Sequence, residues 1–299
     1  MFQIDNSTAV ASMPTPAAAG TPGWFTKGDP VGGVPATIVT DDFLNGIQAE
    51  LIAILTAAGI APSKTALNQL ANAIPLLAPG RLFGVQRFTN AGTFTYTPTP
   101  GTKLIVVEVQ GGGGGGGGAV GTAAGTCAVG GGGASGGYIM GLITAGFSGA
   151  AVTVGAGGNG GSNAAGSAGS ASAFGALLTA NGGGGGFITA SGAAAPQLSG
   201  GGAGGGNSSS GANTFLIRAK IGEVGGTSFM FDTGSNGVGS AGGASELGGG
   251  GGGTQVANSN GQAAASTGAG GGGTANGGSR VSLQGGAGFR GAVVIWEYA

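Results

Sequence analysis

Eight consecutive glycines, residues 111–118, constrain the fold of this chain more than any other stretch. They open a glycine-rich field that continues to about residue 291. Two apolar stretches flank the field, residues 104–109 before it and residues 292–296 after it. Glycine loses more conformational freedom on folding than any other residue, so an ordered field of this kind needs a specific source of stability.

The composition favours order over disorder. Glycine supplies 77 of the 299 residues, which by itself is typical of a flexible linker. Disordered chains, however, are usually rich in charge and poor in apolar residues. Here only 6% of the residues are charged and 40% are hydrophobic, and we therefore expect an ordered glycine-rich domain.

Of two known kinds of extended glycine structure, only one is compatible with such a field. Collagen needs a glycine at every third residue and abundant proline, whereas these glycines come in solid runs with few prolines among them. A bundle of packed polyglycine-type extended helices remains. Without Cβ atoms, neighbouring backbones can approach to about 4.8 Å, and their outward N–H and C=O groups can then bond between segments. At about 3.1 Å per residue, residues 111–118 would span roughly 25 Å.

Several functional classes are disfavoured. The formal net charge is −1 and no basic patch is evident, so we expect neither nucleic-acid binding nor attachment to an anionic membrane. The longest helical apolar stretch, residues 51–60, is too short to span a bilayer, and the lack of Lys or Arg before Lys27 argues against an ordinary signal peptide. Cys127 is the single cysteine, which excludes an intrachain disulfide and fits assembly in a reducing cytoplasm.

Catalytic motifs occur only as spacing matches. Residues 155–160 match the dinucleotide-binding spacing, but no helix pattern or suitably placed acidic residue follows. Residues 133–137 match the nucleophile-elbow spacing, but the chain has no histidine with which to build a Ser-His-Asp triad. No group of side chains has metal-ligand spacing. We therefore expect no catalytic residue, no metal, no cofactor and no enzymatic activity.

The first 80 residues predict an irregular segment followed by a short helical hairpin. Prolines exclude a long helix in residues 1–40. Thr40 or Asp41 is expected to cap a helix that Gly59 ends. Ser63 is expected to cap a second helix, which runs to about Ile74 and is closed by Pro75 and Pro79.

Strand patterns then replace helical ones. Alternating aromatic and threonine residues, a Pro-Gly turn and the apolar stretch 104–109 predict a β transition over residues 81–110. We expect residues 104–109 and 292–296 to pair as strands that hold both ends of the field. Short apolar pieces are expected to supply a thin core, namely residues 138–143, 151–154, 176–178, 214–217 and 228–231. The predicted fold is mainly β and irregular, with a short α-hairpin, a β transition, and a glycine-rich domain of short strands and polyglycine-type helices.

Residues 20–30, GTPGWFTKGDP, and 35–45, PATIVTDDFLN, resemble the head of tail-fibre proteins of tailed bacteriophages and prophages. Residues 57–60 and 67–70 fit the same pattern, so the resemblance covers about residues 20–75. It implies a virion-attachment segment over residues 1–80 that binds baseplate or tail-tip proteins. The candidate attachment residues are Trp24, Phe25, Phe43 and Leu44.

The remainder resembles a glycine-rich domain found at the ends of phage fibres. The resemblance rests on the order of residues 94–96, the turn, residues 104–109 and the glycine run, and on residues 152–158, 174–182 and 286–296. It implies a receptor-binding domain over residues 111–299, a virion location after assembly in the host cytoplasm, and a homotrimer. The receptor would be a pilus, an outer-membrane protein or a glycan.

Polar loops between the glycine runs are the expected receptor contacts, because binding residues concentrate on loops held by a rigid scaffold. The candidate residues are Ile188, Gln197, Asn207, Asn213, Arg218, Lys220, Asn236, Gln255 and Asn258. Arg218 and Lys220 form a charged cluster with Glu223, which is either a solvated turn or intersubunit pair or a contact to an anionic receptor group. Two other functions remain open: a purely structural virion component, and an ice-binding or wall-type glycine-rich protein.

Overall fold

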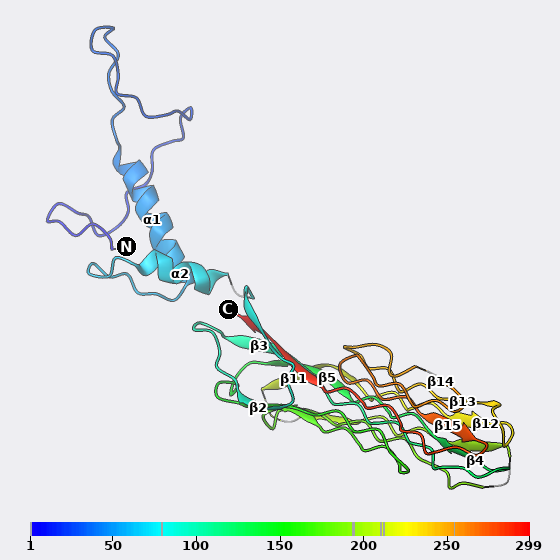
Figure 1. The fold of residues 1–299 in the computed structure, drawn as a ribbon. Coiled ribbons are helices and arrows are strands. Elements are labelled where there is room, and N and C mark those ends of the chain that lie inside the picture. Colours follow the sequence, from blue (N-terminus) through cyan, green and yellow to red (C-terminus); the bar gives the residue numbers. More distant parts are fainter. Residues whose placement is uncertain (1, 79, 193–194, 210, 212, 254) are drawn as a thin grey trace. The chain divides into compact units, whose positions relative to one another are not determined.

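A computed structural model describes residues 2–78, 80–192, 195–209, 211, 213–253 and 255–299. The chain divides into two compact units, Met1–Arg81 together with Ala299 and Leu82–Tyr298 (Figure 1). We call them the helical unit and the glycine-rich unit. No described helix is both long and apolar enough to cross a membrane.

The helical unit contains two helices, α1 (Asp41–Ala57) and α2 (Gln69–Leu77). Thr40 caps α1 as expected, because its side chain accepts a hydrogen bond from the backbone N–H of Phe43. Gly59, with φ +69°, ends this helix in the left-handed conformation that glycine adopts without strain.

The expected bounds of the second helix are wrong at both ends. It begins at Gln69 rather than Ser63, because the Gln69 side chain bonds to Ser63 N and Ala61 O and holds residues 61–63 in an irregular turn. Pro75 lies inside α2 rather than closing it, where its missing N–H removes one helical hydrogen bond. Pro79, the other expected end of this helix, lies outside the described residues.

Two five-stranded antiparallel sheets form one end of the glycine-rich unit. The first has the strand order β1-β16-β3-β5-β11 and the second β10-β8-β7-β6-β2. Their strands are β1 (Leu82–Phe88), β16 (Ala292–Tyr298), β3 (Leu104–Gln110), β5 (Tyr138–Ile143), β11 (Thr214–Lys220), β10 (Asn207–Ser209), β8 (Leu178–Ala180), β7 (Ser172–Phe174), β6 (Ala151–Val154) and β2 (Gly92–Thr95). The segment expected as a β transition therefore supplies β1, β2 and β3 to the same unit as the glycine runs.

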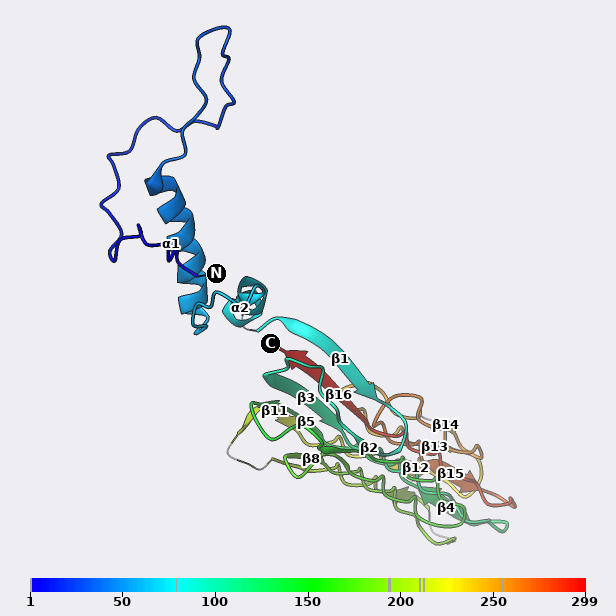
Figure 2. The same ribbon diagram turned by 90° about the vertical axis from the view of Figure 1, so that its left-hand side faces the viewer.

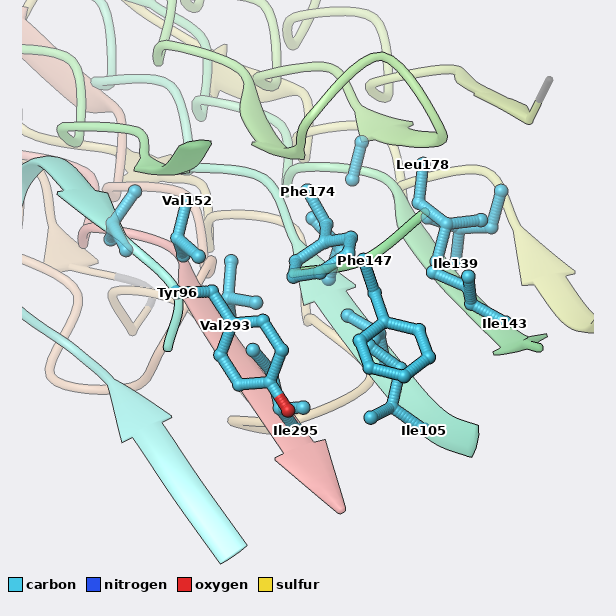
Figure 3. Close-up of a cluster of buried hydrophobic side chains, with 14 residues drawn as sticks. Tyr96, Ile105, Ile139, Ile143, Phe147, Val152, Phe174, Leu178, Val293 and Ile295 are labelled. Atoms are coloured by element: carbon cyan, nitrogen blue, oxygen red, sulfur yellow. The ribbon is translucent and has the colours of Figure 1, made fainter. Parts of the chain in front are cut away.

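The predicted pairing of the two flanking apolar stretches is confirmed. β16 runs antiparallel to β3, from Ala292 opposite Gln110 to Tyr298 opposite Leu104. Side chains from both sheets meet in a buried core that includes Tyr96, Phe147 and Phe174 (Figure 3). The Tyr96 and Phe174 rings lie 5.6 Å apart, edge to face, a favoured aromatic geometry.

Beyond the sheets, the glycine runs form a bundle of extended rods (Figure 2). In the rod of residues 111–118, each N–H donates to a carbonyl of another rod at an N···O distance between 2.7 and 3.1 Å, and every third N–H points to the same neighbour. Gly111, Gly114 and Gly117 donate to residues 137, 134 and 131; Gly112, Gly115 and Gly118 to residues 170, 167 and 164; Gly113 and Gly116 to residues 289 and 286. A period of three is that of the extended three-fold helix, so the polyglycine-type packing is confirmed.

The same rod accepts hydrogen bonds from three further rods. Gly112 and Gly115 accept from Gly183 and Gly186, Gly113 and Gly116 from Gly158 and Gly161, and Gly114 from Gly271. The rod therefore lies inside a hexagonal arrangement with six neighbours. Residues 131–137 and 268–273 form two more rods that are buried along their whole length.

Glycine is required at every position of the rod of residues 111–118, because other backbones occupy the space of its missing side chain. A Cβ atom at any position of 111–118 would overlap a carbonyl group of an adjacent rod. Outer rods relax this requirement at every third residue: Ala156 and Asn159 face solvent, whereas Gly155 and Gly158 beside them face the bundle. The positions of glycine in each rod are thus set by which of its sides face other rods.

Candidate receptor-binding surface

The rods carry a second group of short strands at the end opposite the two large sheets (Figure 1). We call this the distal end, because the chain enters and leaves the glycine-rich unit at Leu82 and Tyr298, which face each other at the sheet end. Its strands are β4 (Cys127–Gly130), β9 (Gln197–Ser199), β12 (Ser228–Met230), β13 (Gly237–Gly239), β14 (Gln255–Val256) and β15 (Thr274–Gly277). They form a β14-β13-β12-β9 sheet and a β15-β4 ribbon.

Rod hydrogen bonds close the base of each distal loop. Phe187 N donates to Gly200 O below the β9 loop, and Gly226 N donates to Ala241 O below the β12–β13 hairpin. Beneath the loops, Cys127, Val129, Met230 and Ala275 form a small fully buried cluster. Burial raises the pKa of the Cys127 thiol, and the nearby Asp232 carboxylate adds to this effect. The distal loops therefore stand on a scaffold that is ordered up to their bases.

The distal sheet presents a row of apolar side chains to solvent. Val256 lies opposite Val238, Val238 opposite Phe229, and Phe229 opposite Leu198, so that each strand contributes one residue. Leu198 and Val256 are 63% and 73% exposed. Phe231 is also exposed, and its ring stacks on that of Phe229 with the centroids 6.3 Å apart and the planes 5° from parallel. We call these five residues the distal apolar row.

Polar residues beside the row are held in fixed conformations. The Asp232 carboxylate accepts hydrogen bonds from the backbone N–H groups of Gly234 and Asn236 and from the Asn236 amide, and these bonds lower its pKa. Asn258 adopts φ +67°, donates to Ser235 Oγ and accepts a bond from Gly277 N. Both turns are thus pre-organised, which lowers the entropy cost of binding.

The sequence-predicted receptor residues fall at opposite ends of the glycine-rich unit. Five lie at the distal end: Ile188, Gln197, Asn236, Gln255 and Asn258. Four lie at the sheet end: Asn207, Asn213, Arg218 and Lys220. The nine residues therefore do not form one surface.

The charged cluster at the sheet end is paired within the chain. Arg218 Nη2 lies 2.6 Å from Glu246 Oε1, and Lys220 Nζ lies 3.3 Å from Glu246 Oε2 and 3.8 Å from Glu223. Glu108 lies beside them; burial raises its pKa, while a hydrogen bond from Tyr138 and the charge of Arg218 oppose that shift. These internal pairs leave less charge available to an anionic receptor group than the sequence indicated.

The candidate attachment residues show mixed environments. Phe25 packs edge to face on Phe43, with ring centroids 5.1 Å apart. Trp24 is 97% exposed and Leu44 is also exposed. Of the four candidates, only Phe25 and Phe43 are thus shown to contact each other.

The apolar row contains residues that were expected in the core. Within residues 228–231, Met230 is buried while Phe229 and Phe231 face solvent. In a strand, side chains alternate between the two faces, so Met230 must face the opposite way from Phe229 and Phe231. Because the residues at these consecutive positions are all apolar, however, the sequence pattern does not say which of the two faces is buried.

Most of the glycine-rich unit matches a known family. The sequence model of the Glycine-rich domain family matches residues 89–298. This chain belongs to that family.

Within the residues that the structure describes, no group of His, Cys, Asp or Glu side chains is arranged to hold a metal ion.

Two tail-fibre proteins are similar to part of this glycine-rich domain protein. Tail fiber protein S of Escherichia phage Mu is 45% identical over 76 residues, which are 25% of this chain and 15% of that protein. The Mu-like prophage FluMu defective tail fiber protein of Haemophilus influenzae is 36% identical over 83 residues, 27% of this chain and 13% of that protein. The match spans less than a sixth of either relative. The predicted resemblance to phage tail-fibre proteins is confirmed over about a quarter of the chain.

Proposed function

We propose that this glycine-rich domain protein is a bacteriophage tail-fibre protein that binds a receptor on the host cell surface through the distal end of its glycine-rich unit. Residues 1–80 attach it to baseplate or tail-tip proteins of the virion, and assembly takes place in the host cytoplasm. The similarity to two tail-fibre proteins supports the first part of this proposal. The distal apolar row supports the second.

Exposed apolar residues in a continuous row are characteristic of an interaction site, since exposed apolar residues in a soluble protein are otherwise mostly scattered. The row has a paired aromatic element, Phe229 and Phe231, at its centre. Aromatic side chains in this setting supply large contact areas with little loss of side-chain entropy. Asn236 and Asn258 lie beside the row and offer amide groups to a polar rim.

Position within the unit favours the distal end over the sheet end. Leu82, where the chain enters the unit, is level with Leu104, so both β3 and the rod of residues 111–118 lie between it and the distal loops. The rod alone spans roughly 25 Å. A surface at the end of the unit opposite the point where the chain enters it is suited to contact with a cell surface. The implied homotrimer would present several such surfaces, and their simultaneous engagement would multiply a weak individual affinity.

Adsorption of particles to the bacterial strain that they infect tests the receptor proposal. We expect Leu198→Ser and Phe231→Ser to reduce the adsorption rate at least tenfold while the amount of the protein in purified particles stays unchanged. Val281→Ser is the matched control, because Val281 is 82% exposed at the same end but lies outside the row. Normal adsorption of the two row variants would refute receptor binding at this surface and favour a purely structural virion component.

A further inference from the structure

The outer face of the five-stranded sheet β1-β16-β3-β5-β11 is apolar although it faces away from the core. Its inward residues, such as Ile105, Val107 and Ile295, are fully buried against the second sheet. A sheet with one face in water normally alternates apolar with polar residues. β3 and β16 instead read LIVVEVQ and AVVIWEY, with apolar residues on both faces.

The strand register places five of these outward residues in one row. Val85 lies opposite Trp296, Trp296 opposite Val106, Val106 opposite Leu142, and Leu142 opposite Phe215. Val85 and Phe215, at the two edges, are 46% and 56% exposed, and the three central residues are half-buried. We call this the sheet apolar row; Figure 2 shows the strands that carry it side by side.

Charges beside this row are distributed unequally between the two edges of the sheet. The adjacent row runs from Arg87 on β1 through Val294 and Glu108 to Met140 and Arg218 on β11. No ion pair among the described residues includes Arg87. At the β11 edge, the two cations Arg218 and Lys220 pair with the carboxylates of Glu223 and Glu246, and Glu108 on the central strand β3 also interacts with Arg218. The β1 edge therefore has an unpaired positive charge, whereas the half of the face from β3 to β11 has one more carboxylate than cations.

We propose that this face is the contact between copies of the chain. The β1 edge of one copy packs beside the β11 edge of the next, with the Val85 end of one sheet apolar row against the Phe215 end of its neighbour and Trp296 inside the assembly. Such a head-to-tail contact closes into a ring when the rotation between copies allows it. Arg87 of each copy then faces the excess carboxylates of its neighbour.

The face supplies most, but not all, of the area that a stable interface needs. Five strands at about 4.8 Å spacing and seven residues at about 3.4 Å give roughly 570 Å², which is below the about 800 Å² per partner of a stable interface. Exposed apolar residues of the β11 edge, Ile217 and Ile221 among them, extend it. A cavity of about 350 Å³ beside Trp296, lined also by Arg87, Glu108 and Leu247, gives a neighbouring side chain a place to insert. The inference is independent of receptor binding and can be tested without host cells.

Cysteine cross-linking of the full-length chain distinguishes this contact from others. Val85 and Phe215 lie four strand spacings apart in one copy, about 19 Å, which is too far for an intrachain disulfide. We expect Val85→Cys/Phe215→Cys to form disulfide-linked dimers and trimers on mild oxidation. Gln86→Cys/Leu216→Cys is the control, because these residues lie on the same two strands but on the opposite face, and it should stay monomeric under denaturing conditions.

Sedimentation velocity gives the second readout. The wild-type chain should sediment as an oligomer, and Trp296→Lys should raise its dissociation constant about 30-fold, as expected for a central aromatic anchor. Phe231→Lys, on the distal apolar row, should leave it unchanged. Arg87→Glu should weaken the assembly, and Arg87→Glu/Glu223→Lys should restore it.

A wild-type chain that stays monomeric at micromolar concentrations would overturn the proposal. So would an oligomer that persists in Trp296→Lys and in Arg87→Glu while the Val85/Phe215 cysteine pair fails to cross-link. That result would assign assembly to another surface, such as the exposed apolar residues of α1. Neither outcome alters the adsorption test, so the two proposals can fail separately.

Discussion

Replacing Gly114 by alanine should destabilise the glycine-rich unit far more than the same substitution on the surface of the bundle. A Cβ atom at Gly114 would lie 2.5 Å from the carbonyl carbon of Gly184 and closer still to its oxygen. Carbon atoms in ordinary contact are about 3.5–4.0 Å apart, so the neighbouring rod must move by about 1 Å. Gly184 cannot move alone, because its carbonyl accepts from Ala134 N and its N–H donates to Ala203 O.

The expected loss can be estimated from these contacts. Overpacking a dense interior costs about 1–3 kcal/mol, and weakening two backbone hydrogen bonds adds about 1–3 kcal/mol. A total of about 2–6 kcal/mol would lower the melting temperature of a unit of this size by roughly 4–24 °C. Thermal unfolding followed by circular dichroism measures the shift.

Gly200→Ala is the matched control for this substitution. A Cβ atom there would meet only the Phe187 ring, at 4.0 Å, although Gly200 belongs to a rod and its carbonyl accepts from Phe187 N. We expect this variant to be neutral or slightly stabilised, because alanine restricts the unfolded chain. Equal melting temperatures for the two variants would show that the rods are not packed through missing side chains, and the account of the bundle would be wrong.

Three further predictions concern single side chains. Burial pushes the pKa of the Glu297 carboxyl up, but hydrogen bonds from Thr99, Tyr96 and Gln86 outweigh it and hold that pKa below its usual range. The stabilisation from these bonds is therefore present above the unfolded-state pKa of about 4.3 and is lost as pH falls through the folded-state value. Glu297→Gln should reduce the free energy of unfolding by about 2 kcal/mol at pH 7, and this difference in urea unfolding should shrink towards pH 3. The buried Cys127 thiol should react with a thiol reagent only as the protein unfolds, so a fast reaction of the folded protein would show that the distal end opens independently of the rods. Asn258→Ala should reduce the free energy of unfolding in denaturant by about 1–2 kcal/mol, because alanine is strained at positive φ and cannot accept the hydrogen bond from Gly277 N. Asn258→Gly also lacks that hydrogen bond but is not strained, so it should recover the part of the loss that is due to φ; equal losses would exclude backbone conformation as the cause.

The rods and the strands that flank them could be predicted because their causes are local in sequence. Runs such as 111–118 have no side chain to separate neighbouring backbones, and the apolar stretches beside the field are continuous apolar runs of strand length that pair with each other. The outer rods also carry a local signal. Gly166 and Gly169 recur at the spacing of three that keeps one face of a rod free of side chains. Solid glycine runs therefore indicate interior rods, and glycines spaced by three indicate outer ones.

The functional surface was harder to predict because its causes are not local. Loops at both ends of the rods share the same Ser, Asn and Gly composition, and only the order of the rods in space separates Asn258 from Asn207. In β11 and β12, consecutive apolar residues leave the buried face undecided. Phe215 and Phe229 were therefore assigned to the core although both are exposed. The start of α2 depends in turn on side-chain bonds of Gln69 that no helix-capping pattern contains.

The period of three also explains why the bundle can carry different loops without losing its structure. Each residue of a rod turns the next N–H by about 120°, so removing one residue inside 111–118 would redirect every later N–H to a different neighbour. Removing one residue from a distal loop leaves all rod residues in phase, because the bonds that close the loop, such as Phe187 N to Gly200 O, lie at its base. Changes of length are therefore costly in the rods and tolerated in the loops. A scaffold built from backbone hydrogen bonds thus leaves the side chains of the distal end free to vary with the surface that they contact.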